Sequence, residues 1–177
     1  MKNLYLSLIL LLGMTLQAQI YKGSASLGAS ITLDVTLNTN TDSVDVEISG
    51  PASGYFAVGF GGTGMNGTYI MLVNVNGTVQ ERKLGQWNGG STLSSSISYS
   101  AITSSGTRTA FIERARIGAS TNHYTFPANG GSIALIWAKG GTSFGNHGSS
   151  NRGFGSINLI NQCNIASTTL TTRSICP

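Results

Sequence analysis

The sequence predicts an all-β protein, an antiparallel immunoglobulin-like β-sandwich. Glycine is abundant, with 24 residues among 177, and runs of helix-forming residues are almost absent. Residues 31–37 (ITLDVTL) and 44–48 (VDVEI) alternate apolar and polar side chains, which is the period of a half-buried strand. Clusters of turn-forming residues separate such segments along the chain, as is typical of sandwiches.

The expected strands follow one another from residue 31 to residue 160. The turn sequence NTNTD at 38–42 separates the first two, and Asn76-Gly77 is a hairpin signal. Residues 55–60 and 69–75 are apolar at almost every position, which indicates strands that are more deeply buried. The remaining strands are expected at residues 78–84, 96–102, 107–116, 132–138 and 155–160.

Three segments describe the organisation of the chain. Residues 1–18 have a charged start, an apolar run at 4–14 and a small residue at Ala18, which predicts a secretory signal peptide. Residues 19–162 form one sandwich domain without an apolar stretch long enough for a membrane helix. Residues 163–177 form a tail in which Cys163 and Cys176 are expected to pair as a disulfide. We therefore expect a secreted or periplasmic protein.

The charged residues argue against two classes of function. The basic residues are scattered, so a nucleic-acid surface is not expected, and Arg82-Lys83 and Arg114/Arg116 are interpreted as solvated strand faces. The six acidic residues show no spacing of a catalytic carboxylate pair, and no nucleophile-elbow motif occurs. A Ser-His-Asp triad would have to assemble in space and stays open. We expect a protein that is not an enzyme.

The chain contains two histidines, and each lies in a segment predicted as a loop. His123 belongs to Asn122-His123-Tyr124 and is interpreted as an exposed polar residue. His147 belongs to the glycine-rich segment 140–148 (GGTSFGNHG), and taken alone it would also be a surface histidine.

Met65 changes the interpretation of His147. It lies in FGGTGMNGT at 60–68, so two apolar strands each run into a glycine-rich loop, one with a single Met and the other with a single His. A thioether and an imidazole are an axial pair for heme iron, and glycine backbone lets a flat macrocycle approach. Alternatively Met65 fills the core, as expected for Met71. Five aromatic residues could wall an apolar slot: Phe60, Tyr69, Trp137, Phe144 and Phe154.

The order of several motifs resembles the DOMON family. GYFAVGFG at 54–61, GMNG at 64–67 and an apolar strand before Asn76-Gly77 are similar to the core of that domain. TAFIERAR at 109–116, NHYTF at 122–126, the strand at 133–139, His147 and GSINL at 155–159 match its later part. One departure is Tyr69, which stands where many members have an acidic residue.

The resemblance implies a β-sandwich over about residues 20–160 that binds heme b non-covalently or, in some branches, sugars. It implies that Met65 and His147 are the axial ligands of the heme iron. No Cys-x-x-Cys-His motif occurs, so a covalently attached c-type heme is excluded. Arg114, Arg116 and Arg152 are candidates for binding the heme propionates.

The expected function is therefore that of a secreted b-type cytochrome domain that carries single electrons. Its partner would be a redox protein, a quinone or a small reductant, because the chain has no flavin or nicotinamide motif. An alternative is a non-redox module for carbohydrate or another small ligand, with Trp87 and Tyr99 as stacking platforms. A structural or adhesive domain without a ligand is the third possibility.

Overall fold

The computed structural model describes residues 19–162, and these residues form eleven β-strands. The predicted signal peptide and the predicted Cys163–Cys176 disulfide lie outside the described residues, so both stay predictions. The strands are β1 (Ile20–Ser26), β2 (Thr32–Asn38), β3 (Ser43–Pro51), β4 (Phe56–Phe60), β5 (Tyr69–Val73), β6 (Val79–Gly85), β7 (Asn88–Thr92), β8 (Ile97–Ser104), β9 (Thr107–Ala115), β10 (Gly131–Lys139) and β11 (Arg152–Asn161).

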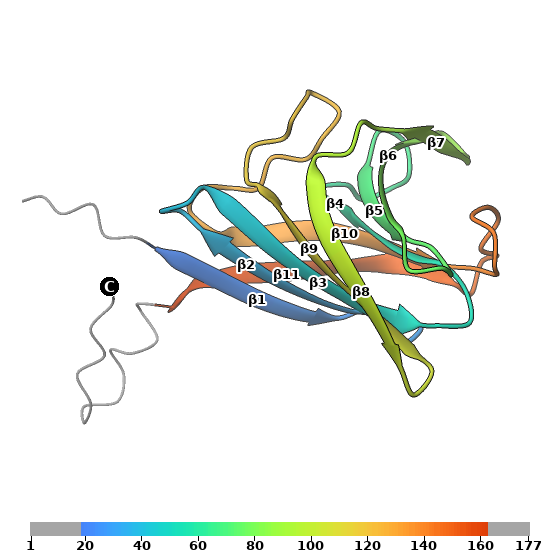
Figure 1. Cartoon of the computed structure of the whole chain (residues 1–177). Coiled ribbons are helices and arrows are strands. Elements are labelled where there is room, and N and C mark those ends of the chain that lie inside the picture. The colour runs from blue at the N-terminus through green and yellow to red at the C-terminus, as the bar shows by residue number, and fades with distance from the viewer. Residues whose placement is uncertain (1–18, 163–177) are drawn as a thin grey trace, which may run out of the picture.

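All eleven strands belong to one antiparallel sheet that folds over on itself. Their order is β7-β6-β5-β4-β10-β11-β1-β2-β3-β9-β8. The two halves meet where β1 pairs with β11, Tyr21 opposite Asn161 and Lys22 opposite Ile160. In Figure 1 the half made of β1, β2, β3, β9 and β8 lies across the half made of β7, β6, β5, β4, β10 and β11, so that the sheet forms two layers. The predicted all-β antiparallel sandwich is confirmed, and all nine expected strands are present.

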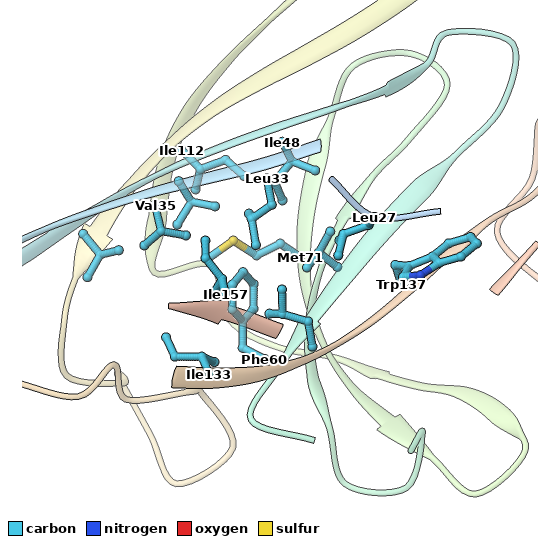
Figure 2. Close-up of a cluster of buried hydrophobic side chains, with 14 of the residues drawn as sticks. Leu27, Leu33, Val35, Ile48, Phe60, Met71, Ile112, Ile133, Trp137 and Ile157 are labelled. Carbon is cyan, nitrogen blue, oxygen red and sulfur yellow. The ribbon is translucent and has the colours of Figure 1, made fainter. Parts of the chain in front are cut away.

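The core between the layers follows from strict alternation along the strands. In β2 the buried residues are Leu33, Val35 and Leu37, and the residues between them point outward. Figure 2 shows Leu33 and Val35 facing Met71, which lies in the middle of the core. Met71 is completely buried, so its predicted structural role is confirmed.

β4 and β5 differ from the other strands because every residue of both is buried. Alternation sends their side chains to both faces of the sheet, so the inner face packs in the sandwich and the outer face needs a separate cover. Burial on both faces explains why the sequence of these strands is continuously apolar.

Two strands were not expected from the sequence, β1 (IYKGSAS) and β7 (NGGST). β7 consists of residues with little β-propensity, and in β1 only the first two residues, Ile20 and Tyr21, favour a strand. β1 is held by its neighbours on both sides, and Gly23 is required there because a Cβ atom would lie 2.6 Å from the carbonyl oxygen of Asn158. Tertiary pairing therefore overrides a weak local signal in β1.

Candidate functional site

A second apolar cluster lies on the outer face of β4, β5 and β10, outside the sandwich core. Its buried members are Tyr55, Ala57, Ile70, Leu72, Leu84 and Ile136. They alternate with residues that enter the core, such as Met71 between Ile70 and Leu72. The other half of the sheet covers the opposite face. Two partly buried side chains from two loops, Met65 and Phe144, pack against the outer cluster.

The loop at residues 61–68 carries Met65 onto this cluster. The main-chain N–H of Thr68 donates to Met65 O (3.0 Å), and the Thr68 hydroxyl donates to Gly64 O (2.5 Å). Gly67 N–H donates to Leu84 O at 2.9 Å, and its φ of 72° is one that glycine adopts without strain. The base of the loop is therefore pinned to β6, and Met65 folds onto the outer face of the sheet instead of entering the sandwich core.

The loop at residues 140–151, which carries His147, is tied to the start of β4. It is closed by Lys139 N–H donating to Asn151 O at 2.9 Å, and Gly140 N–H donates to Tyr55 O at 3.0 Å. The Tyr55 hydroxyl donates to Gly145 O at 2.8 Å, and burial raises the pKa of that hydroxyl. Tyr55 thus anchors the loop at two points and belongs to the outer cluster as well.

The ring of His147 has one nitrogen available for a metal. Its Nδ1 lies 2.9 Å from Gly148 O, and a carbonyl oxygen only accepts, so Nδ1 carries the proton. In the neutral ring the lone pair is therefore on Nε2, which is the arrangement of a metal-ligating imidazole with a backbone partner. His147 is half-buried and lines a pocket of about 180 Å³ together with Tyr55, Lys139 and Gly140.

In His123, by contrast, both ring nitrogens are engaged in hydrogen bonds. Its Nδ1 lies 2.8 Å from the hydroxyl of Ser120, and its Nε2 lies 3.1 Å from Ser94 O. The interpretation of His123 as an exposed residue is wrong, because the side chain is buried with 9% exposure. The two histidines therefore differ in chemistry, and His147 is the one that could bind a metal.

The structure brings the two predicted ligand loops to the same outer face. Met65 and Phe144, which is three residues before His147, pack on one cluster. Tyr55 links the two sides, since its ring contacts Phe144 edge-on at 5.2 Å between centroids and also lines the pocket of His147. Met65 does not line that pocket. The pairing of Met65 and His147 on one metal stays a prediction.

Only one of the five proposed wall aromatics faces the outer cluster. Phe60, Tyr69 and Trp137 point into the sandwich core, and Phe154 is exposed. Phe60 and Tyr69 are paired across β4 and β5, so their side chains share the inner face. Phe144 alone packs on the cluster. The residues that form the outer cluster, whose side chains lie on the strand faces opposite to the core, were not identified from the sequence. They include Tyr55, Ile70, Leu72, Leu84 and Ile136.

A polar cluster buried in the sandwich interior was also not expected. Its centre is Glu81, whose Oε1 accepts the Tyr69 hydroxyl at 2.6 Å and the Ser96 hydroxyl at 2.8 Å. Arg114 Nη1 lies 4.0 Å from Glu81 Oε1, and His123 Nε2 lies 3.8 Å from it. Both Glu81 and Arg114 are almost completely buried, so the interpretation of Arg114 as part of a solvated strand face is wrong.

This polar cluster has a structural role. Arg114 donates from Nη2 to Tyr124 O at 2.8 Å, and its guanidinium lies 5.3 Å from the centroid of the Tyr69 ring. Its Nη1 has no hydrogen-bond partner among residues 19–162, so Glu81 is the charge that compensates it. His123 donates from Nε2 to the Ser94 carbonyl, so its Nδ1 accepts the hydrogen of the Ser120 hydroxyl, and both ring nitrogens are held by hydrogen bonds.

Two of the three arginines considered for propionate binding are engaged elsewhere. Arg114 lies inside the sandwich and cannot reach the outer cluster. Arg116 pairs with Asp42, Nε to Oδ1 at 2.5 Å, and donates to Phe126 O at 3.0 Å. Both residues belong to the half of the sheet that contains β9. Arg152, the third candidate, is exposed at the start of β11.

A second hollow lies on the outer face of the other half of the sheet. It has a volume of about 500 Å³ and includes the side chains of Phe111, Tyr99 and four acidic residues, Asp34, Asp45, Glu47 and Glu113. The carboxylates face one another directly across the strands, Asp34 opposite Glu47 and Asp45 opposite Glu113. Phe111 and Tyr99 are 40% and 43% exposed. Trp87, the other proposed stacking residue, is exposed at the turn between β6 and β7.

Comparison with known proteins gives a likeness of fold. No family model matches the chain, and no curated protein matches it. A solved structure of similar fold is the cytochrome b domain of pyranose dehydrogenase from Coprinopsis cinerea. The TM-score is 0.52 at 14% identity, and the match covers 76% of this chain and 80% of that chain. The likeness supports, at the level of the fold, the resemblance seen in the sequence.

The buried charge at Glu81 generates the first prediction. Replacing Glu81 by Ala leaves the Arg114 guanidinium buried without a counter-charge, which we expect to lower the free energy of unfolding by about 3–5 kcal/mol. Urea denaturation followed by circular dichroism measures it. Glu113→Ala, an exposed carboxylate on β9, is the control and should change stability by no more than about 0.5 kcal/mol. Equal losses in the two variants would contradict the structural role of Glu81.

Tyr69 generates the second prediction. Burial, the strongest influence, raises the pKa of its hydroxyl far above the ordinary value of about 10, and the neighbouring Glu81 carboxylate adds to the effect. Above about pH 10 the unfolded chain loses this proton while the folded chain keeps it, so stability falls as the pH rises.

Tyr69→Phe removes the ionising group, and we expect its unfolding free energy to fall less steeply between about pH 10 and 11.5 than that of the wild type. At pH 7–9 the variant should be less stable by about 1–2 kcal/mol, because the bond to Glu81 is lost. Denaturation curves at a series of pH values measure both effects. Parallel pH profiles above pH 10 would show that the hydroxyl ionises equally easily in the folded chain.

Proposed function

We propose that the protein is a b-type cytochrome domain, in which Met65 and His147 bind the iron of a non-covalent heme. The observation that carries the proposal is the apolar outer face of β4, β5 and β10. It lies outside the sandwich core, and a Met-bearing loop and a His-bearing loop both border it. A thioether and a neutral imidazole are ligands that heme iron accepts.

The residues at this face suit a flat apolar ligand. Ile70, Leu72 and Ile136 supply an apolar floor, and Gly59 in the middle of β4 adds no side chain. Around the two ligand residues, a Cβ atom on any of five loop glycines would meet nothing within 4 Å: Gly64, Gly67, Gly141, Gly145 and Gly148. The loop tips therefore offer bare backbone next to open space, which allows a macrocycle to come close.

The expected chemistry is electron transfer. The heme, when bound, supplies the one-electron couple of its iron. Because Met65 and His147 would both hold the iron, side chains of the protein itself would take the places where oxygen or a substrate could bind, and the domain would not be an enzyme. The chain would exchange electrons with a redox protein, a quinone or a small reductant.

The proposed setting is the outside of the cell or the periplasm, because residues 1–18 have the pattern of a secretory signal. Among the described residues, none forms a helix that is long and apolar enough to cross a membrane.

A second candidate function rests on the hollow that contains Phe111 and Tyr99. Exposed aromatic rings can stack on a sugar, and the neighbouring carboxylates can accept hydrogen bonds from its hydroxyl groups. In that case the protein is a module for carbohydrate or another small ligand, and the outer cluster under Met65 is ordinary packing. The two functions use opposite faces of the molecule, so they can be tested separately.

The third prediction concerns heme binding. The mature chain, produced with heme supplied, should show sharp low-spin α and β bands on reduction. Met65→Leu and His147→Gln should abolish these bands and weaken hemin binding by at least about tenfold, because each removes an iron ligand. Met65→Leu keeps the apolar contact with the cluster, so it tests the sulfur alone. Asn66→Ala and Ser149→Ala, exposed neighbours in the same two loops, are the controls.

Two results would contradict the proposal. One is a colourless protein whose thermal stability does not change when hemin is added. The other is a coloured protein whose spectrum is the same in the Met65 and His147 variants. Binding on a glycan array, lost in Phe111→Ala, would favour the carbohydrate function instead.

A further inference from the structure

Arg82 lies on β6 at the border of the outer cluster. It precedes Leu84 by two residues, so both side chains point to the same face of the strand. The guanidinium lies over the ring of Phe144, with 4.9 Å between Cζ and the ring centroid. Phe144 in turn packs on the cluster beneath. A cation is therefore held against the apolar face to which the heme is assigned.

The hydrogen bonds of Arg82 fix its position but do not neutralise it. Nε donates to Gly89 O at 3.0 Å, Nη2 donates to Gly90 O at 3.1 Å, and Nη1 donates to the Thr92 hydroxyl at 2.5 Å. All three acceptors are uncharged. A guanidinium has five N–H groups, so these three bonds leave one on each terminal nitrogen for a further acceptor. The geometry is pre-organised for a carboxylate.

The acidic residues of the chain lie elsewhere. The full sequence has six: Asp42 pairs with Arg116, Glu81 is buried in the sandwich, and the other four line the hollow on the opposite half of the sheet. Among the ion pairs of residues 19–162, none includes Arg82. Since none of the residues from 19 to 162 supplies an anion to this cation, a ligand carboxylate is the partner that fits.

We propose that Arg82 binds a propionate of the heme, an inference that rests on the proposed function. Two other cations lie near the ligand loops. Lys139 lines the pocket of His147, and Arg152 is exposed at the start of β11. Arg82 is distinguished from both because its side chain is already held by three hydrogen bonds and by Phe144. A pre-ordered guanidinium loses less side-chain entropy when a carboxylate binds.

The experiment compares hemin with hemin dimethyl ester, in which both propionates are uncharged. The wild type should bind hemin more tightly than the ester. Arg82→Gln should weaken hemin binding by about ten- to hundredfold and leave ester binding nearly unchanged, because it removes a charge-assisted bond that only the acid makes. Arg82→Lys keeps the charge without the fork and should fall between the two. Lys83→Gln is the matched control at the next position.

The outcomes separate this inference from the proposed function. If the wild type binds no hemin, or binds it independently of Met65 and His147, the proposed function fails and this inference with it. If binding depends on those residues but Arg82→Gln weakens acid and ester equally, Arg82 acts through packing on Phe144 and the inference is overturned. The inference is also overturned if Lys139→Gln no longer distinguishes hemin from its ester while Arg82→Gln still distinguishes them as the wild type does. If Arg82→Gln does not fold, Arg82→Lys decides, because unchanged discrimination there excludes a bidentate role.

Discussion

The need to bury both faces of β4 and β5 governs this structure. Their side chains are apolar on both sides, and the sandwich covers one side. The outer side, with Ile70 and Leu72, depends on Met65 and Phe144, which reach it from loops. An apolar face that loops cover can be opened or shared with a ligand more easily than one sealed by another sheet, since loops are the lower-stability parts of a fold.

The two outer faces of the sandwich differ in charge. Four of the six carboxylates line one hollow, and Asp42 and Glu81 are each paired with an arginine. The outer cluster is bordered instead by Arg82 and, beside His147, by Lys139. An anionic ligand is therefore favoured at one face and disfavoured at the other. Heme b has an apolar ring and two carboxylates, which match the apolar surface and the neighbouring cations of the outer cluster.

Alternation, continuous apolar runs and turn signals together predicted nine strands but not which face each apolar residue takes. Residues 55–60 are apolar throughout, so the pattern leaves open that Phe60 enters the core while Tyr55 lies outside. Arg114 was misplaced because a charged residue in an alternating strand normally faces water; here Glu81 on a distant strand compensates it. Met65 and His147 were singled out as candidates because each is the one side chain of its type in a glycine-rich loop, and their shared role stays a prediction; β1 and β7 carry no comparable signal.

Tyr55 connects the loop that carries His147 with the cluster on which Met65 packs. Its main chain and hydroxyl hold the loop of His147, and its ring belongs to the cluster on which Met65 rests. The other loop is held at its base by Gly67 and Leu84. Both bases are thus fixed by the same sheet, while the tips near Gly64 and Gly148 border open space. A ligand that contacts both loops would need to reorder only the residues at their tips. The conformational entropy lost on binding would then come from a few residues.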